Sequence, residues 1–257
     1  LAGVLLGVKR SWFCHDGVLM NKAIQFSGGK DSIVCLHLFK DEPDIKAIFT
    51  NTGNAFPHVL DFVSETCESF GVPLIIAGPE KPVIQWHKDN GFPSDIVPWD
   101  STPAMNGVSE NDFGETLVPY TDCCSANVWE PMHKAVVDND IKYVIRGSKS
   151  CDSKVGVPDG FVDEGGVYYH SPLWDWTDKD VFDYIAEHKL MLPDQYSHGR
   201  NDSLDCWCCT AYMGKSGAAR ISYTKEKYPE LYDIIQPNIL AVNATIKTAL
   251  NHYAEGF

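Results

Sequence analysis

With 257 residues, of which 44% are hydrophobic and 22% charged, the chain has the composition of a globular protein that can bury a sizeable core. No apolar run approaches the roughly 20 residues of a membrane-spanning helix. The formal net charge of −14 disfavours a broad nucleic-acid-binding surface, so a small-molecule substrate is favoured.

The first 19 residues are considered separately. Their apolar stretch 1–8 is followed by Lys9 and Arg10, the reverse order of a secretory signal, and Met20 directly precedes the first predicted strand. We therefore expect a cytoplasmic protein in which residues 1–19 are an extra or non-native N-terminal segment. Residues 20–257 are expected to form a single domain.

Short β-rich runs then alternate with helical patterns. The patterns predict strands over 22–26, 45–50 and 73–77, and helices over 33–39 and 58–70. Strands that alternate with helices favour a mostly parallel central sheet flanked by helices, so the predicted fold class is α/β.

The middle of the chain is less regular. Pro, Gly, Asn and Asp crowd residues 90–122, which predicts a long irregular excursion that forms part of a site rim. A helix from about 126 to 138 follows. The β-branched and aromatic run 143–145 then predicts another buried strand.

Two further helices are predicted near the C-terminus. Thr177 and Asp180 have the spacing of a capping box that opens a helix over 181–188. Apolar residues at helical spacing predict a closing helix over 239–253.

A glycine-rich loop follows the first strand and opens the first helix. It consists of Ser27, Gly28, Gly29, Lys30, Asp31 and Ser32. In this context backbone N–H groups and the helix dipole attract phosphate oxygens, although a simple turn with an exposed lysine is the alternative. The loop lacks the spacing of a Walker A motif. It resembles the PP-loop of the ATP pyrophosphatase (adenine nucleotide alpha hydrolase-like) superfamily, which implies an adenylate site formed by these six residues.

A second nucleotide-binding signal follows the second strand. Thr52 and Gly53 resemble the acid-Thr-Gly turn of the same family, with Asn51 where an aspartate is usual. Ligands of open parallel sheets bind outside the carboxyl ends of the strands, where both Ser27 and Thr52 are predicted to lie.

A third signal follows the strand 143–145. Gly147, Lys149 and Ser153 resemble a glycine, arginine, serine pattern that contacts the anionic part of the substrate in sulfonucleotide reductases. Lysine replaces arginine here, and the neighbouring Arg146 is a candidate for the missing bidentate contact. The alternative is a solvated basic loop.

The segment 171–193, which begins Ser-Pro-Leu-Trp-Asp-Trp-Thr, closely resembles a signature of the phosphoadenosine phosphosulfate (PAPS) and adenylyl-sulfate (APS) reductase family. Its residues have structural roles: Thr177 caps a helix, and Val181 and Ile185 are spaced to face the core. The segment therefore supports the family assignment and no catalytic role.

Four cysteines form two pairs, the adjacent Cys123 and Cys124 and the C-x-x-C pair Cys206 and Cys209. They resemble the ligands of the [4Fe–4S] cluster in assimilatory APS reductases, which implies an iron–sulfur site in the C-terminal half. Zinc is the alternative metal, and a vicinal disulfide or buried thiols are the alternatives without metal. The remaining cysteines except Cys208 are expected to be small buried hydrophobes or inert thiols: Cys14, Cys35, Cys67 and Cys151.

The chain departs from that pattern in two ways. Asn127 and Val128 stand where the iron–sulfur reductases carry an arginine and a lysine. Those reductases also use a nucleophilic cysteine in a C-terminal motif, and no cysteine follows Cys209 here. Cys208 is therefore the candidate nucleophile that the sequence places beside the expected site.

The resemblance implies an enzyme that reduces the sulfate of APS or PAPS to sulfite with a thioredoxin-like thiol donor. An ATP-dependent adenylating sulfurtransferase of the tRNA or DNA thiolation type, also with a [4Fe–4S] cluster, is the first alternative. A noncatalytic nucleotide-binding relative is the second.

Overall fold

The computed structural model describes residues 14–15, 18–96, 113–152, 159–200, 203, 206–211 and 215–255. The chain divides into two compact units. The first comprises Leu1–Phe49, Val63–Ile75 and Lys134–Leu192, and the second comprises Thr50–Phe62, Ile76–His133 and Pro193–Phe257. None of the described helices is both long and apolar enough to span a bilayer.

A six-stranded sheet, in the order β5-β4-β3-β8-β10-β9, forms the core of the first unit. The strands are β3 (Lys22–Gln25), β4 (Ile45–Thr50), β5 (Leu74–Ala77), β8 (Tyr143–Ile145), β9 (Phe161–Val162) and β10 (Tyr168–His170). β3 pairs in parallel with β4 and β8, β10 pairs in parallel with β8, and the edge strand β9 is antiparallel to β10. Ile24, opposite Ala47 and Ile145, lies at the buried centre. The mostly parallel α/β sheet predicted from the sequence is confirmed.

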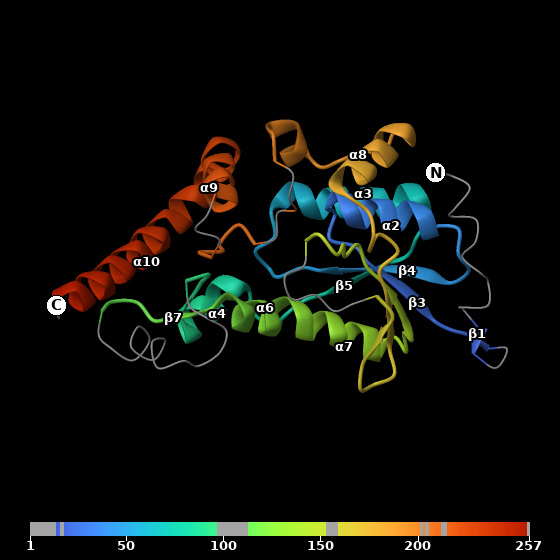
Figure 1. The fold of residues 1–257 in the computed structure, drawn as a ribbon, viewed down its shortest axis with the longest axis horizontal. Coiled ribbons are helices and arrows are strands. Elements are labelled where there is room, and N and C mark those ends of the chain that lie inside the picture. The colour runs from blue at the N-terminus through green and yellow to red at the C-terminus, as the bar shows by residue number, and fades with distance from the viewer. Residues whose placement is uncertain are drawn as a thin grey trace. The chain divides into compact units, whose positions relative to one another are not determined.

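Helices cover both faces of this sheet. In Figure 1, α2 (Lys30–Phe39), α3 (Pro57–Phe70) and α8 (Asp178–Glu187) lie on one side of the strands, and α7 (Glu130–Asp138) lies on the other. α2 buries the apolar side chains of Ile33, Val34 and Leu36, and burial of such a face favours packing of the helix against the sheet. The capping box at α8 is confirmed: Asp180 N–H donates to Thr177 Oγ1, and Thr177 N–H donates to Asp180 Oδ2.

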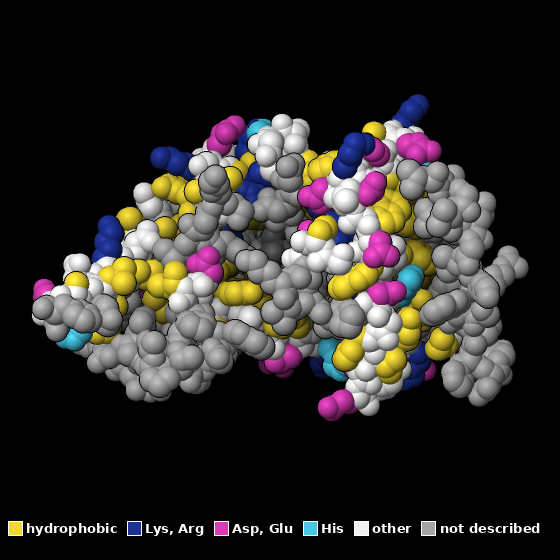
Figure 2. Space-filling model, in the orientation of Figure 1, with side chains coloured by type: hydrophobic (Ala, Val, Ile, Leu, Met, Phe, Trp, Pro, Cys, Tyr) yellow, Lys and Arg dark blue, Asp and Glu magenta, His cyan; other side chains and the backbone are white. Residues whose placement is uncertain are grey.

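The second unit contains shorter elements. They are α4 (Val83–Asn90), β6 (Phe92–Ser94), β7 (Leu117–Pro119), α6 (Tyr120–Cys124), a π-helix (Ser125–Trp129), a 3-10 helix (Asp194–His198), α9 (Lys215–Lys227) and α10 (Pro229–Glu255). β6 and β7 pair in parallel, with Phe92 opposite Leu117. Hydrophobic side chains are visible over the long helix α10 in Figure 2, and its exposed large apolar residues are Ile234, Leu240 and Leu250.

Three boundaries predicted from the sequence were wrong. The excursion 90–122 is not irregular at its ends, because β6 lies near its start and β7 and the first turn of α6 lie at its end; residues 97–112 lie outside the described part. The helix expected from about 126 begins at Tyr120 and passes through one π-helical turn. The last helix begins at Pro229 and not near 239, because it continues through Pro237.

Candidate nucleotide site and cysteine cavity

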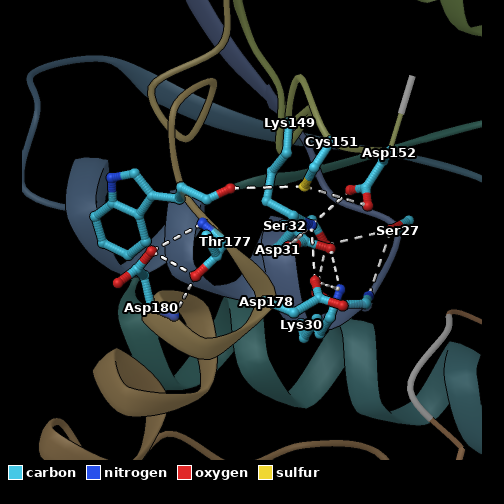
Figure 3. Close-up of polar contacts among 12 residues, drawn as sticks. Ser27, Lys30, Asp31, Ser32, Lys149, Cys151, Asp152, Thr177, Asp178 and Asp180 are labelled. Atoms are coloured by element: carbon cyan, nitrogen blue, oxygen red, sulfur yellow. Dashed lines mark hydrogen bonds and ion pairs between the residues drawn. The ribbon is translucent and has the colours of Figure 1, made fainter. Parts of the chain in front are cut away.

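The predicted phosphate loop lies between β3 and α2 in the first unit (Figure 3). Gly28 has a φ of +76°, a conformation that glycine adopts without strain. Ser32 Oγ donates to the carbonyl oxygen of Gly29 at 2.9 Å, and the Ser27 and Ser32 hydroxyls are 3.2 Å apart. The two hydroxyls predicted to contact phosphate therefore lie together at the N-terminus of α2.

Gly147 brings the loop after β8 against the start of α2. A Cβ atom at this position would lie 2.8 Å from the carbonyl carbon of Asp31 and 3.0 Å from the backbone nitrogen of Ser32. Both neighbours are backbone atoms of the first helical turn, so only glycine permits this approach. The structure thus unites two motifs that are more than 110 residues apart in the sequence.

An ion-pair cluster lies beside the phosphate loop (Figure 3). Lys149 Nζ lies 2.6 Å from Asp31 Oδ1, 2.6 Å from Asp152 Oδ2 and 3.2 Å from Asp178 Oδ1. Lys30 Nζ lies 2.8 Å from Asp31 Oδ2 and 3.0 Å from Asp178 Oδ1. Both lysines are buried, and the carboxylates outnumber the ammonium groups by one.

These pairs fix the charge state of the cluster. Burial alone would lower the pKa of Lys149, but hydrogen bonds to Asp152 and Asp31 raise this pKa above its ordinary value. Burial alone would raise the pKa of Asp178, but hydrogen bonds from Lys30 and Lys149 hold it below its ordinary value. Both shifts favour the charged forms of Lys149 and Asp178 at neutral pH.

Asp152 and Asp178 were missed by the sequence analysis. Asp178 directly follows the capping residue Thr177, in a segment to which only structural roles were assigned. Its position directly after the N-cap of a predicted helix was a local signal, but its proximity to the phosphate loop is seen only in the structure.

Arg146, a further residue predicted for the anionic part of the substrate, directly follows β8. Arg146 Nε donates to Ser171 Oγ at 3.3 Å, and its guanidinium lies 5.4 Å from the centroid of the Tyr169 ring. Ser153 lies outside the described residues.

Thr52 and Gly53 follow β4 and belong to the second unit. Gly53 adopts a φ of +73°, and its N–H donates to Asn51 Oδ1 at 2.9 Å. Thr52 is buried, and its Oγ1 accepts a hydrogen bond from Cys206 Sγ at 3.2 Å. Thr52 therefore contacts one of the predicted metal ligands.

A cavity of about 390 Å³ in the second unit is lined by the four predicted metal ligands. Cys123 and Cys124 come from α6, and Cys206 and Cys209 come from the segment 206–211. Other described lining residues include His87, Asn127, Arg200 and Arg220. The sequence analysis named the four thiols, and the structure gathers them around one space.

Hydrogen bonds hold the walls of this cavity. Arg220 Nη2 donates to the carbonyl oxygens of Cys209 at 2.7 Å and of Ala211 at 3.2 Å. Asn127 Nδ2 donates to the carbonyl oxygen of Cys123 at 2.8 Å. Cys209 N–H donates to the carbonyl oxygen of Cys206 at 3.3 Å, which closes the C-x-x-C turn.

The donor set fits a group bound by four thiolates. Burial, followed by the charges of Cys124, Cys209 and Cys208, raises the pKa of Cys123, and a metal relieves such crowding by binding thiolates. Zinc holds each thiolate sulfur at about 2.3 Å. Within the described ranges, no three Cys, His, Asp or Glu side chains come close enough to share one ion. As donors, four thiols around one space are a set that an iron–sulfur cluster uses.

The remaining described cysteines fall into two classes. Cys35 and Cys67 are buried, as expected. Cys151 is exposed, so of the two expectations, a small buried hydrophobe or an inert thiol, the first is wrong for it; its Sγ lies 3.8 Å from Asp152 Oδ1 and 3.7 Å from the carbonyl oxygen of Trp176 (Figure 3). The side chain of Cys14 is outside the description.

Cys208, the candidate nucleophile, is fully buried and is not among the described residues that line the cavity. Burial, followed by the charge of Cys209, raises its pKa to about 12. A nucleophilic thiol needs access and a thiolate form, so this environment disfavours the role expected of Cys208.

The sequence and the structure are both similar to known proteins. A phosphoadenosine 5'-phosphosulfate reductase of Vibrio vulnificus is 27% identical over 180 residues, which cover 69% of this chain and 62% of the relative. The chain thus matches about three fifths of that relative's length.

Two solved structures share the fold. A phosphoadenylyl-sulfate reductase from Candida auris, in a phosphate complex, superposes with a TM-score of 0.52 at 20% identity and covers 73% of this chain and 81% of its own. A Candida glabrata FMN adenylyltransferase, in complex with FMN and the ATP analogue AMPCPP, superposes with a TM-score of 0.50 at 15% identity. This match covers 78% of this chain and 60% of the adenylyltransferase chain.

The family model of the phosphoadenosine phosphosulfate reductase domain matches residues 21–212, which include the phosphate loop, the Thr177 capping box and all four cavity thiols. Since this match extends over most of the sequence, the chain belongs to the phosphoadenosine phosphosulfate reductase domain family.

Proposed function

We propose that this protein is a sulfonucleotide reductase-like enzyme that binds an adenylated sulfate at the phosphate loop and reduces the sulfate to sulfite. The observation that carries the proposal is the position of two buried lysines, Lys30 and Lys149, at the N-terminus of α2 beside the Ser27 and Ser32 hydroxyls. Cations, hydroxyls and a helix N-terminus together favour an anionic ligand.

Binding requires the lysines to exchange partners. Asp31 and Asp178 hold Lys30, and Asp31, Asp152 and Asp178 hold Lys149. An incoming phosphate or sulfate oxygen would replace a carboxylate at one of these ammonium groups. Asp152 and Asp178 are half exposed in their side chains, so they can turn toward solvent when displaced. The carboxylates thus hold the lysines in position until an anion takes their place.

The cysteine cavity is proposed to hold a [4Fe–4S] cluster through Cys123, Cys124, Cys206 and Cys209. When bound, such a cluster supplies a redox-active centre of high local charge. The chain's own contribution is the rigid wall: Arg220 fixes the carbonyl groups of the C-x-x-C turn, and Asn127 fixes that of Cys123.

Reduction needs a thiolate that attacks the sulfur of the sulfate group. The S–O bond to the nucleotide then breaks, AMP or its 3′-phosphate leaves, and the thiol sulfur carries a sulfonate. A second thiol, from a thioredoxin-like donor, attacks the first thiol sulfur and releases sulfite. The two thiols are oxidised to a disulfide, and their electron pair reduces the sulfate. Cys151, exposed in the unit that contains the phosphate loop, and a partner's thiol are better placed for attack than the buried Cys208.

The burial of Cys208 favours a second candidate function, an ATP-dependent adenylating sulfurtransferase. In this reaction the phosphate loop binds ATP, an acceptor oxygen attacks the α-phosphate, and pyrophosphate leaves. It requires no nucleophilic thiol in the first step. A noncatalytic nucleotide-binding relative is the third possibility, and it predicts binding with no turnover.

Anaerobic single-turnover incubation of the reconstituted full chain separates these functions. The protein is mixed in parallel with APS, PAPS or ATP, each with and without a thioredoxin-like dithiol. The products quantified are sulfite, pyrophosphate, and AMP or its 3′-phosphate. Sulfite release from APS or PAPS supports the proposal. Pyrophosphate from ATP without sulfite from either sulfonucleotide contradicts it and establishes the second candidate. Binding without any product contradicts the proposal and is the outcome that the third possibility predicts.

A further inference from the structure

His87 of α4 reaches one of the cavity thiols. Its Nε2 lies 3.5 Å from Cys123 Sγ, and the residue is 2% exposed. Its other ring nitrogen, Nδ1, is buried and makes no hydrogen bond with the described residues. Buried polar atoms are rarely left in this state, so the hydrogen bond between His87 Nε2 and Cys123 requires an explanation.

The surroundings fix the imidazole in place. The first turn of α4 is held by hydrogen bonds from Val83 N–H to the carbonyl oxygen of Thr52 and from Ile84 N–H to Asn54 Oδ1. The His87 ring lies 5.9 Å from the Phe92 ring, centroid to centroid. Rotation of the ring away from the cavity would therefore disturb the packing of β6.

The direction of the hydrogen bond follows from the two ring nitrogens. If Cys123 donated its S–H to Nε2, the neutral ring would carry its own hydrogen on Nδ1, where a buried donor would lack an acceptor. If Nε2–H donates to the sulfur, Nδ1 carries only a lone pair, and a buried unpaired acceptor is the less costly of the two. A metal-bound thiolate has no proton and accepts such a hydrogen bond.

A second N–H group approaches the same sulfur. Asn127 belongs to the π-helix that follows the double cysteine, and its Nδ2 lies 3.8 Å from Cys123 Sγ. Val128 stands where the resemblance to iron–sulfur reductases leads one to expect a lysine. The N–H groups of His87 in α4 and Asn127 in the π-helix are thus available to Cys123 in a chain that has Val128 in place of the expected lysine.

We propose that His87 is a positioning residue that donates its Nε2–H to the Cys123 sulfur and so stabilises the iron–sulfur cluster held in the cavity. This inference rests on the cluster proposed above. Hydrogen bonds to ligand sulfurs raise the reduction potential of a cluster, and loss of an outer-shell partner commonly weakens metal retention about 10–100-fold.

Two substitutions test the role. His87→Phe keeps a planar ring but removes the N–H group, whereas His87→Gln places an amide N–H near the position of Nε2. For the anaerobically reconstituted chain, we expect His87→Phe to lower the midpoint potential and to release iron to a chelator about tenfold faster than wild type. His87→Gln should restore most of both values. Wild-type potential and iron retention in His87→Phe would overturn the inference.

A spectroscopic comparison of the wild-type chain with His87→Gln covers the case in which His87→Phe fails to fold. Protein labelled with ¹⁵N-histidine is reconstituted and reduced, and pulsed EPR is recorded on the cluster. A histidine nitrogen coupling that is absent from the His87→Gln spectrum supports the inference, and a spectrum without such coupling overturns it. A wild-type chain that binds no iron overturns the proposed cluster as well, while nucleotide turnover tests the proposed reaction separately.

Discussion

Lys149 Nζ lies 2.6 Å from Asp31 Oδ1, and this ion pair connects the loop after β8 to the first turn of α2. Lys149→Met keeps the aliphatic stem but removes the cation that Asp31, Asp152 and Asp178 share, so that Lys30 alone remains beside Asp31 and Asp178. We expect the free energy of unfolding to fall by about 2 kcal/mol, less than for a fully buried pair, because the carboxylates reach solvent. Urea denaturation measures this change. Lys142→Met, which removes a solvent-exposed pair with Asp140, should cost less than about 0.5 kcal/mol; equal losses would contradict the special role of Lys149.

Lys30→Ala should weaken nucleotide binding and leave the fold intact. A hydrogen bond to a charged group contributes about 1.5–3 kcal/mol, so affinity for the bound nucleotide should fall about 10–100-fold. Calorimetric titration with APS, PAPS and ATP measures the loss, and circular dichroism checks the fold. Lys40→Ala is the matched control, because Lys40 follows the other end of α2 and pairs with the exposed Asp41. Unchanged affinity in Lys30→Ala would exclude the phosphate-loop assignment.

Asp178 makes stability depend on acid pH. Its pKa in the folded chain is held below the ordinary value of 3.8 by hydrogen bonds from Lys30 and Lys149, against the opposing effect of burial. A lowered carboxylate pKa stabilises the fold above the ordinary pKa, and this stabilisation is lost as the pH falls through the lower folded value. Thermal unfolding between pH 2 and 7 should therefore show a steeper loss below about pH 4 in wild type than in Asp178→Asn. If the unfolding temperatures of wild type and Asp178→Asn fell in parallel with pH, the ion pairs of Asp178 would not contribute to the acid dependence of stability.

Regular elements could be predicted where one local pattern decides them. The β-branched run Ile45–Thr50 is a strand with the predicted bounds. The Thr177 capping box opens α8 as expected, although the helix begins at Asp178 and not at 181. β9 and β10 were missed because their residues are exposed or half-buried and lack a clear alternation. The start of α10 was missed because Pro237, which usually interrupts a helix, lies within it.

The candidate site shows the same division. The phosphate loop, Gly147, Lys149 and the four cavity thiols were identified from motifs, since each motif is local. Asp178 and His87 were not, because their roles arise from contacts 148 and 36 residues away along the chain, with Lys30 and Cys123. The exposure of Cys151 and the burial of Cys208 depend on the packing of loops, which no local pattern records.

Cys206→Ser should remove the brown colour of anaerobically purified protein. Cys206 lines the cavity, and three thiolates with one hydroxyl hold a [4Fe–4S] cluster less well than four thiolates. Visible absorption and iron content per chain measure the loss. Cys151→Ser is the control, since the exposed Cys151 belongs to the other unit and should leave both values unchanged. Colour retained in Cys206→Ser would exclude Cys206 as a ligand.

Alkylation of the native chain ranks the candidate nucleophiles. Burial, followed by the charge of Cys209, raises the pKa of Cys208 and so disfavours its thiolate form at pH 8, and its fully buried side chain gives a reagent no access. Iodoacetamide followed by peptide mass spectrometry should therefore label the exposed Cys151 first and Cys208 only after denaturation. If the two were labelled at equal rates, the loop that buries Cys208 would open readily, and Cys208 would regain its place as the nucleophile. If Cys151 alone is labelled, and if Cys151→Ser also abolishes sulfite release, then Cys151 is the attacking thiol. If sulfite release survives both Cys151→Ser and Cys208→Ser, the attacking thiol belongs to a partner.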